Sequence, residues 1–476
     1  MTSTRTDGRS VRPGTGPGRL VLALVCACQF VVILDVSIVN VALPSVQRDL
    51  GFTASGLAWV VNGYVLVFAG FMLLGGRGAD LFGYRRTVVA GLSLFSLASL
   101  VAGLAATPEM LVGARAAQGL GGAVLAPATL AVINTCFPRE PERARAFGAW
   151  SASGGVGGMV GALAGGALTT GLSWRWVFLI NVPIGVALVA VAMTSLTAAA
   201  PTARREPVDL LGAITGTAGL SVLVHGVMQT ADHAWASARV LVPILAGVLL
   251  LAVFLVVEKR FAAAPMMPLR LFENRGVAVG SGLLLLFGGI ATAMWFFSSL
   301  FMQNVLGYSA LDAGLGQTPA AAAFVVVARF TVGWLPRTGV RPPVLAGCAC
   351  FVIGFGWLSQ AGAGSHYVAG VLGPTLLVAI GIGLVFPTLM AAATADVPPD
   401  EAGIVGGLAT TASQVGGSIA LAVYATAAAA RTATHDSASS SPTALAAGYA
   451  LVFGLAVGVA LAMAAVSVLL RPPQRS

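Results

Sequence analysis

Two side chains of opposite charge lie within apolar stretches of this sequence, where charge is costly. Asp35 stands in the run LDVSIVN, and Arg115 stands in the run GARAAQG. An ionisable residue inside a membrane-spanning stretch indicates a functional site, and it needs a partner of opposite charge. Burial favours the neutral form of a carboxyl group, which suits Asp35 to proton exchange near physiological pH. We therefore predict a proton-coupling pair of Asp35 and Arg115, supported by Gln118 and Asn40.

Each member of this pair also has a purely structural interpretation. Asp35 could be a static hydrogen-bonded residue in helix packing, and Arg115 could extend its charged end toward the membrane surface. The other 16 of the 17 acidic residues fall in tails, loops or the ends of apolar runs, which favours the functional interpretation of Asp35. Helical rise places both side chains in the outer half of the membrane at similar depth, so each is a plausible counter-ion for the other.

The elements that hold these residues must be membrane helices. Hydrophobic residues make up 57% of the 476 residues and charged residues only 9%, against about 25% charged in soluble proteins. A helix that crosses a bilayer needs about 20 mostly apolar residues. We predict an all-α polytopic membrane protein with 14 transmembrane helices, at roughly 20–43, 57–75, 87–106, 110–135, 146–171, 176–197, 209–229, 239–257, 277–302, 310–331, 343–360, 367–394, 403–429 and 446–470.

The distribution of basic residues predicts the orientation of these helices. With the N-terminus inside, the outer loops hold only Arg48, Arg175, Arg239 and Arg431, and Arg115 lies in a span. All other basic residues fall on the inner side, as the positive-inside rule expects. We predict a multi-pass protein of the bacterial inner (plasma) membrane with both termini in the cytoplasm. A twelve-span alternative that omits 209–257 gives the same orientation.

An internal repeat predicts the domain organisation. Three glycine-containing segments recur in the same order about 256 to 260 residues later, namely 83–91 with 339–347, 121–127 with 381–387, and 148–158 with 407–417. Paired halves are typical of transporters. We predict a disordered cytoplasmic tail at 1–18, an N-terminal six-helix half at 19–200, an inserted transmembrane helix pair at 201–262 and a C-terminal six-helix half at 263–476.

Several classes of function find no support in the sequence. Lys259 is the only lysine, so there is no Walker A loop for ATP. The four histidines lie far apart without the spacing of metal ligands, and no nucleophile-elbow motif is present. The net charge of +9 is spread over short loops rather than gathered in a run that would bind nucleic acid. We expect no metal, no cofactor, no nucleic-acid partner and no enzymatic activity.

The loop after the second predicted span carries a family motif. Its sequence GRGADLFGYRR contains the residues of a charge-locked turn, and it resembles the cytoplasmic loop motif of the major facilitator superfamily. This copy has Gly78 and Leu81 where the family commonly has Leu and a basic residue. The resemblance implies a cytoplasmic hinge formed by Gly76, Asp80, Gly83, Arg85 and Arg86.

Further motifs are similar to the fourteen-span drug:proton antiporter branch of that family. The GARAAQG run resembles its fourth-span motif, whose Arg is associated with proton coupling, while LDVSIVNVALP and WRWVFLINVPIG resemble two more of its motifs. The fifth predicted span resembles the antiporter motif, with Ala162 in place of the customary Pro. Small residues at this spacing make a flat face for close helix packing, and the residues concerned are Gly157, Gly161, Gly165 and Gly166.

The resemblance implies a proton-coupled antiporter that exports hydrophobic or cationic drugs or antibiotics by alternating access. Its expected partners are protons, a small hydrophobic or cationic molecule and the lipid bilayer, and we expect a monomer. Deprotonated Asp35 is expected to attract a cationic or polar group of the substrate. Two alternatives are an importer of a small metabolite with the same fold and, from another class, a membrane-embedded enzyme or sensor. Candidates for an aromatic substrate cavity are Trp59, Tyr64, Trp150, Trp295 and Phe297.

Overall fold

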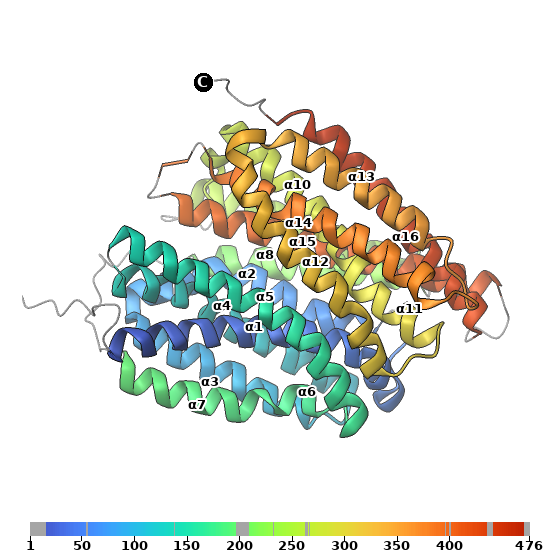
Figure 1. Ribbon diagram of the computed structural model, residues 1–476, viewed down its shortest axis with the longest axis horizontal. Coiled ribbons are helices and arrows are strands. Elements are labelled where there is room, and N and C mark those ends of the chain that lie inside the picture. Colours follow the sequence, from blue (N-terminus) through green and yellow to red (C-terminus); the bar gives the residue numbers. More distant parts are fainter. Residues whose placement is uncertain are drawn as a thin grey trace, which may run out of the picture.

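The computed structural model describes residues 16–53, 56–137, 139–196, 209–231, 233–261, 265, 267–395, 397–398, 401–435 and 441–470. Within these ranges all regular secondary structure is helical. Residues 1–15 of the predicted tail lie outside the described residues, whereas residues 16–18 already belong to the first helix. Two groups of helices lie side by side, one lower and one upper in the view of Figure 1.

The first group contains the helices that carry Asp35 and Arg115. Its members are α1 (Gly16–Leu50), α2 (Ala58–Phe82), α3 (Tyr84–Gly103), α4 (Pro108–Cys136), α5 (Glu140–Gly171), α6 (Trp176–Leu179) and α7 (Asn181–Ser195). Helix α1 is 35 residues long and extends beyond the predicted 20–43 at both ends. We call the end of the bundle where α1 begins and α2 ends the proximal face, and the end where α1 ends and α2 begins the distal face.

The second group repeats this pattern later in the chain. It contains α10 (Arg275–Thr292), which continues through a π-helical turn (Ala293–Phe297) into α11 (Ser298–Asn304), and the helices α12 (Ala310–Thr338), α13 (Arg341–Leu358), α14 (Gly373–Thr394), α15 (Ala402–His435) and α16 (Pro442–Ser467). A second π-helical turn, Val368–Leu372, leads into α14. The helices α8 (Leu210–Met228) and α9 (Ala238–Val256) lie between the two groups in sequence.

Local sequence signals set several helix boundaries. Thr107 caps α4 by accepting a hydrogen bond from the Met110 N–H, and Pro108 occupies the first turn, where proline has no hydrogen bond to lose. Asp209 caps α8 in the same way, by accepting from the Gly212 N–H. Gly83 and Gly339 join α2 to α3 and α12 to α13 with φ of 81° and 71°, a left-handed conformation that glycine adopts without steric cost.

Twelve of the helices in the described ranges are long and apolar enough to cross a membrane. They include both α8 and α9, which agrees with the predicted pair at 209–229 and 239–257. The other two predicted spans correspond to α2 and α5, which have 25 and 32 residues. Helix α5 is rich in Gly and Ala and begins with charged residues, which lowers its hydropathy. The apolar part of α2, Ala58–Met72, is short.

Equivalent glycines form equivalent contacts in the two groups. A Cβ on Gly91 of α3 would lie 3.2 Å from the Gly121 carbonyl oxygen of α4. A Cβ on Gly347 of α13 would likewise lie 2.9 Å from the Gly381 oxygen of α14. The segments around these glycines were matched in the sequence repeat, so the repeat corresponds to a repeated packing of helix pairs.

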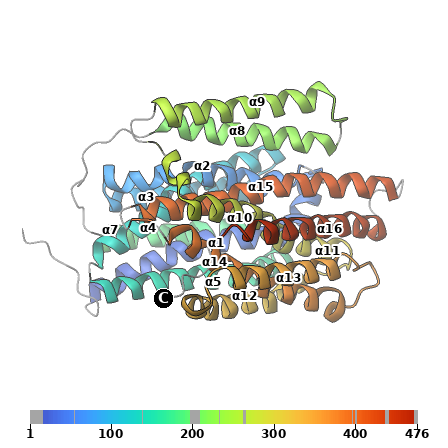
Figure 2. The ribbon, with the colours of Figure 1, turned by 90° about the horizontal axis from the view of Figure 1, so that it is seen from above.

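The helices α8 and α9 lie along one side of the bundle (Figure 2). In that view α8 faces α2 and α15, and α9 forms the outer edge. The exposed face of α9 is apolar and includes Val242, Leu245 and Leu249, as expected for a helix surrounded by lipid. Helix α8 therefore contacts one helix from each group.

Contacts between the two groups are closest near the distal face. The Gln303 Nε2 donates to the Val41 carbonyl oxygen at 3.0 Å, and the Leu311 N–H donates to the Thr170 hydroxyl at 3.3 Å. A Cβ on Gly166 of α5 would lie 2.6 Å from the carbonyl oxygen of Ala310 in α12. Helices α5 and α12 thus meet at backbone distance where α5 ends and α12 begins.

A buried ion pair as the candidate functional site

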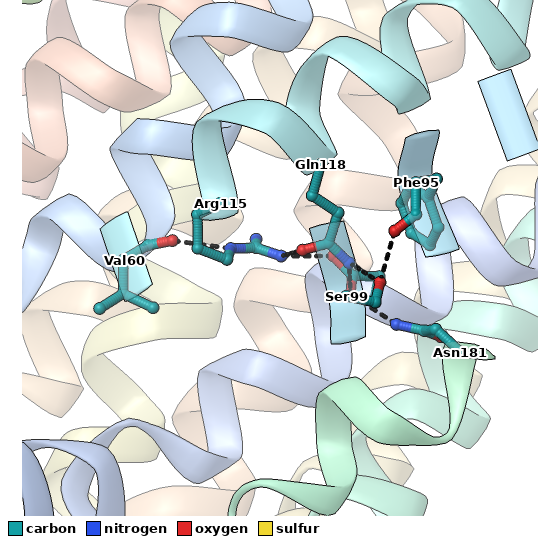
Figure 3. A network of polar contacts seen from close by, with 7 residues as sticks. Val60, Phe95, Ser99, Arg115, Gln118 and Asn181 are labelled. Atoms are coloured by element: carbon teal, nitrogen blue, oxygen red, sulfur yellow. Dashed lines mark hydrogen bonds and ion pairs between the residues drawn. The ribbon is translucent and has the colours of Figure 1, made fainter. Parts of the chain in front are cut away.

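Asp35 is fully buried in a polar network of the first group. Figure 3 labels Arg115, Gln118 and Asn181, which contact it. Its Oδ2 accepts a hydrogen bond from the Arg115 Nη1 at 2.6 Å. Its Oδ1 accepts from the Gln118 Nε2 at 2.6 Å and from the Asn181 Nδ2 at 2.9 Å. One guanidinium and two carboxamides therefore compensate the charge of the carboxylate, as a buried ion requires.

Arg115 is held on several sides. Its Nε donates to the Val60 carbonyl oxygen at 2.9 Å, and its Nη1 also donates to the Gln118 Oε1 at 2.7 Å. The guanidinium carbon lies 4.4 Å from the centre of the Tyr64 ring and 5.8 Å from that of Phe178, within the range of a cation–π contact. With 1% of its surface exposed, Arg115 does not extend to the membrane surface.

Gln118 extends the network to α3. Its Nε2 also donates to the Ser99 hydroxyl at 2.8 Å, and Ser99 in turn donates to the Phe95 carbonyl oxygen at 2.8 Å. The chain of contacts thus connects α1, α2, α3, α4 and α7 (Figure 3). Asp35 is the one carboxylate in this set of contacts, so its protonation would change the hydrogen bonding of helices that are far apart in sequence.

Glycines of α5 bring that helix against the turn of α1 that carries Asp35. A Cβ on Gly157 would lie 2.7 Å from the Phe30 carbonyl oxygen, one on Gly161 would lie 2.8 Å from that of Leu34, and one on Gly165 would lie 2.6 Å from that of Ile38. The Ser37 hydroxyl donates to the Gly158 carbonyl oxygen at 2.6 Å. The predicted flat face of α5 therefore packs on α1, whereas Gly166 faces α12 of the second group.

Glycines also set the approach of α2 to α4. A Cβ on Gly119 would lie 2.3 Å from the Tyr64 carbonyl oxygen, and one on Gly122 would lie 2.9 Å from the Tyr64 hydroxyl. This close contact holds the Tyr64 ring beside Arg115 and places the Val60 carbonyl within reach of its Nε. The small residues of the GARAAQG segment thus position the cation that they flank.

The WRWVFLINVPIG motif has two roles in the structure. Near the distal face, the Trp174 Nε1 and the Arg175 Nη1 donate to the Asp49 Oδ2 at 2.9 and 2.6 Å, and the Arg175 Nη2 donates to the Ala105 carbonyl oxygen at 3.2 Å. Seven residues after Trp174, Asn181 joins the buried network. The motif therefore ties the ends of α1 and α3 to the segment that carries Asn181.

The structure brings together three of the four residues predicted for the coupling site. Asp35, Arg115 and Gln118 are in direct contact. Asn40 lies five residues further along α1, is half-buried, and has no side-chain hydrogen bond among the described residues. Asn181 supplies the supporting amide that was predicted at Asn40, and it belongs to the WRWVFLINVPIG motif.

The predicted hinge residues lie where α2 meets α3. Gly83 is buried at this junction, and the Thr87 hydroxyl donates to the carbonyl oxygens of Gly78 and Gly83 at 2.9 and 3.1 Å. Arg85 is half-buried and Arg86 is exposed. The surroundings of Gly76 and the side chain of Asp80 lie outside the described part of the chain. The predicted charge lock at Asp80 therefore stays a prediction.

The five aromatic candidates for a substrate cavity lie in separate places. Trp59 packs against His225 of α8, with ring centres 6.2 Å apart. Tyr64 belongs to the buried network, and the Trp150 Nε1 donates to the Thr129 hydroxyl at 3.1 Å. In the second group, Phe297 contacts Tyr424 and Tyr449 edge-on, and Trp295 accepts a hydrogen bond at its carbonyl from Gln317. No ring contact in the described part of the chain joins two of the five.

The described residues show no cluster of metal ligands. No group of three or more His, Cys, Asp or Glu side chains lies close enough to hold a metal ion. The five cysteines are all free thiols, half-buried or buried in apolar surroundings. The chemistry of the site is therefore that of a buried carboxylate with three side-chain donors.

Solved structures of membrane transporters have this fold. The chain aligns with a POT family peptide transporter described as auto-inhibited, with a TM-score of 0.70 and 15% identity over 96% of this chain and 98% of that one. It also aligns with a bacterial homologue of the human lysosomal transporter Spinster, in an inward-facing and unoccupied conformation, with a TM-score of 0.69 and 15% identity over 97% of this chain and all of that one.

Residues 25–421 match the Major Facilitator Superfamily, and the chain belongs to that family of transporters. It is 45% identical to the cephamycin export protein CmcT of Amycolatopsis lactamdurans, over 98% of this chain and 95% of that protein. It is 36% identical to the puromycin resistance protein pur8 of Streptomyces alboniger, over 92% of this chain and 88% of that protein. The expected absence of enzymatic activity agrees with this assignment to a transporter family.

Proposed function

We propose that the protein is a proton-coupled antiporter that exports antibiotic-like small molecules across the bacterial plasma membrane. The direction of transport is supported by the relatives, one named for cephamycin export and another for puromycin resistance. These two relatives are named for different antibiotics, so we assign no single compound. The substrate class that we propose, hydrophobic or cationic, is the one that the family resemblance implies. We also propose that the protein works as a monomer.

The observation that carries the proton coupling is the set of contacts around Asp35. Three side-chain donors from α4 and α7 converge on this one carboxylate. Protonation removes the negative charge that holds these donors, so the hydrogen bonds among α1, α4 and α7 must rearrange. Because Asp35 is fully buried, a substrate does not touch it in this conformation. We therefore assign Asp35 the role of a switch rather than that of a direct ligand of the substrate.

Helix α5 connects this switch to the interface between the groups. One of its faces packs on the α1 turn that carries Asp35, through Gly157, Gly161 and Gly165. Its distal end meets α12 through Gly166. A rearrangement at Asp35 is therefore two helix contacts away from the junction that alternating access must open and close. The close distal contacts describe a conformation closed at the distal face.

We further propose fourteen membrane spans with both termini in the cytoplasm, so that the proximal face is the inner one. Helices α2 and α5 supply the two spans beyond the twelve apolar ones. They are 25 and 32 residues long, and about 20 residues suffice to cross a bilayer. They pack inside the bundle against α4 and α1 respectively, which explains why they need less apolar surface.

The test begins with antibiotic susceptibility. A pump-deficient bacterium that expresses the chain should tolerate higher concentrations of some antibiotics, and a protonophore should abolish this gain. Purified protein in weakly buffered detergent should then release protons when one of those antibiotics is added. Asp35→Asn preserves the size of the side chain and removes the titrating group, so proton release should fall to background.

Asp49→Asn is the matched control for this test. Asp49 lies on the same helix and also pairs with an arginine, but its side chain is 47% exposed at the distal end. It should release protons as the wild type does. Equal release from Asp35→Asn and wild type would place the coupling site elsewhere. Resistance that persists with a protonophore would contradict proton-driven export itself.

A further inference from the structure

A cavity lies apart from the Asp35 network, where α8 and α9 meet both groups of helices. Its volume is about 340 Å³, within the range of about 300–1,000 Å³ usual for small-molecule sites. Five helices contribute to its wall, which includes Gly70 of α2, Thr217 of α8, Phe254 of α9, Ser281 of α10 and Ala412 of α15. No residue of the Asp35 network lines it.

The wall of this cavity is apolar with a few hydroxyl groups. Leucine, phenylalanine, alanine and glycine make up most of the lining. Thr217 and Ser281 are 7% and 4% exposed, and their hydroxyl oxygens have no hydrogen-bond partner among the residues that the structure describes. A buried polar group without a partner costs about 1–3 kcal/mol. A molecule that combines apolar surface with a hydrogen-bonding group matches this lining better than water or a purely apolar molecule does.

The position of the cavity adds a second argument. Gly70 belongs to the first group, Ser281 and Ala412 belong to the second, and Thr217 and Phe254 belong to the helix pair beside them (Figure 2). Gly70 admits α8 so closely that a Cβ there would overlap the Thr217 hydroxyl. Helix α8 thus packs tightly on α2 beside the cavity. A molecule in that space would contact all three parts of the transporter at once.

We propose that this cavity is a second binding site, for an amphipathic molecule with an apolar chain or ring and one hydroxyl or carbonyl group. The apolar part would lie against Phe254 and Leu285. The polar group would pair with Thr217 or Ser281 after that side chain turns its hydroxyl, which is buried in this conformation, toward the cavity. Such a molecule can come from two sources, the membrane lipid or a free amphipathic compound. The site is separate from Asp35 and does not depend on proton coupling.

Photo-crosslinking of the full chain in lipid nanodiscs tests the site. The first probe is a hexadecanol that bears a diazirine in its chain, and the second is a phosphatidylethanolamine with a diazirine in one acyl chain. Mass spectrometry should find the alcohol crosslinked to peptides of α8, α9 and α10 that line the cavity. Equal crosslinking by the phospholipid identifies the source as membrane lipid, and crosslinking by the alcohol alone identifies a free amphipath.

Gly282→Phe is the variant that should empty the site. Gly282 lines the cavity, and a Cβ there meets no atom of the described residues within 4 Å, so the new ring can enter the cavity without displacing a helix. Crosslinking of the lining peptides should fall at least fivefold. Gly454→Phe is the matched control, because Gly454 on α16 is equally free of neighbours and does not line the cavity. It should crosslink as the wild type does.

A paired hydroxyl test checks the polar half of the proposal. Thr217→Val removes the hydroxyl at nearly constant shape and should weaken crosslinking by the alcohol. Thr215→Val should not, because the Thr215 hydroxyl already donates to the Leu211 carbonyl oxygen of its own helix at 2.7 Å and does not line the cavity. Crosslinks that are the same in the wild type and Gly282→Phe, or confined to the exposed face of α9, would overturn the site. Asp35→Asn should crosslink normally, so this proposal and the proposed transport function can fail separately.

Discussion

The Nη1 of Arg115 and the Oδ2 of Asp35 lie 2.6 Å apart, although the two residues are 80 positions apart in the sequence. Both side chains are removed from solvent, whereas the second arginine–aspartate pair on α1, Arg175 with Asp49, is 36% and 47% exposed at the same 2.6 Å. The two pairs thus have the same chemistry and different burial. They offer a direct comparison of what burial does to an ion pair in this protein.

Arg115→Ala should strongly destabilise the protein. Removal of one partner leaves a buried carboxylate without its counter-charge, which costs about 3–5 kcal/mol. Arg175→Ala breaks the exposed pair and should cost only about 0–1 kcal/mol from that pair. Thermal unfolding of the purified variants in detergent measures the difference. Equal melting temperatures for the two variants would show that the buried pair contributes no more than the exposed one.

A side chain at Gly161 should separate α5 from α1. A Cβ there would lie 2.7 Å from the Ser37 Cβ and 2.8 Å from the Leu34 carbonyl oxygen. Gly161→Val should therefore cost about 1–3 kcal/mol of stability and reduce transport. Gly148→Val, on the same helix, is the control, since no atom lies within 4 Å of its Cβ position. Normal transport and stability in Gly161→Val would mean that α1 and α5 need not pack closely.

The sequence alone was sufficient to predict the charged centre of the buried network. Charges inside apolar runs are rare enough that Asp35 and Arg115 stood out, and Gln118 follows one turn later on the same helix. Asn181, Ser99 and Tyr64 were not assigned to the network, because uncharged residues in a helix do not show which neighbour they face. Asn181 had one signal, its place in the WRWVFLINVPIG motif.

The aromatic candidates show where prediction from sequence was limited. When nearly every position of a helix is apolar, hydrophobic periodicity no longer distinguishes faces toward lipid, a cavity or another helix. Trp59 and Phe297 therefore could not be assigned to a face, and the structure places them in unrelated clusters. The sequence repeat related Gly91 and Gly121 to Gly347 and Gly381, and the structure shows that these glycines form equivalent helix contacts.

The loop between α8 and α9 should face the outside if fourteen helices span the membrane. Trp235 in that loop is 67% exposed, and Phe82 at the end of α2 is 62% exposed. In a cysteine-free background, a membrane-impermeant maleimide should label Trp235→Cys from outside intact cells and should label Phe82→Cys only after the cells are opened. Labelling of both from the same side would exclude this topology.

Asp80→Asn tests the predicted cytoplasmic hinge. If Asp80 forms a charge lock with Arg85 and Arg86, its neutral variant should change the transport rate while the amount of protein in the membrane stays near normal. The control is Glu109→Gln, a charge removal in the first turn of α4 at the distal face. Transport at the wild-type rate by Asp80→Asn would leave the loop with no role beyond setting the orientation of the chain.

Asn181→Ala should weaken proton exchange without changing the titrating residue. Asn181 supplies one of the two donors to the Asp35 Oδ1, so its loss makes the buried carboxylate less favourable relative to the carboxylic acid. The protonated form then persists more often when substrate binds, and fewer protons should be released per substrate bound. Asn304→Ala is the matched control, because Asn304 donates its amide to Tyr449 in the second group at 3.1 Å. If both variants release protons as the wild type does, Asn181 only fills space beside Asp35. If Asn181→Ala alone falls short, α7 takes part in the proton switch together with α1 and α4.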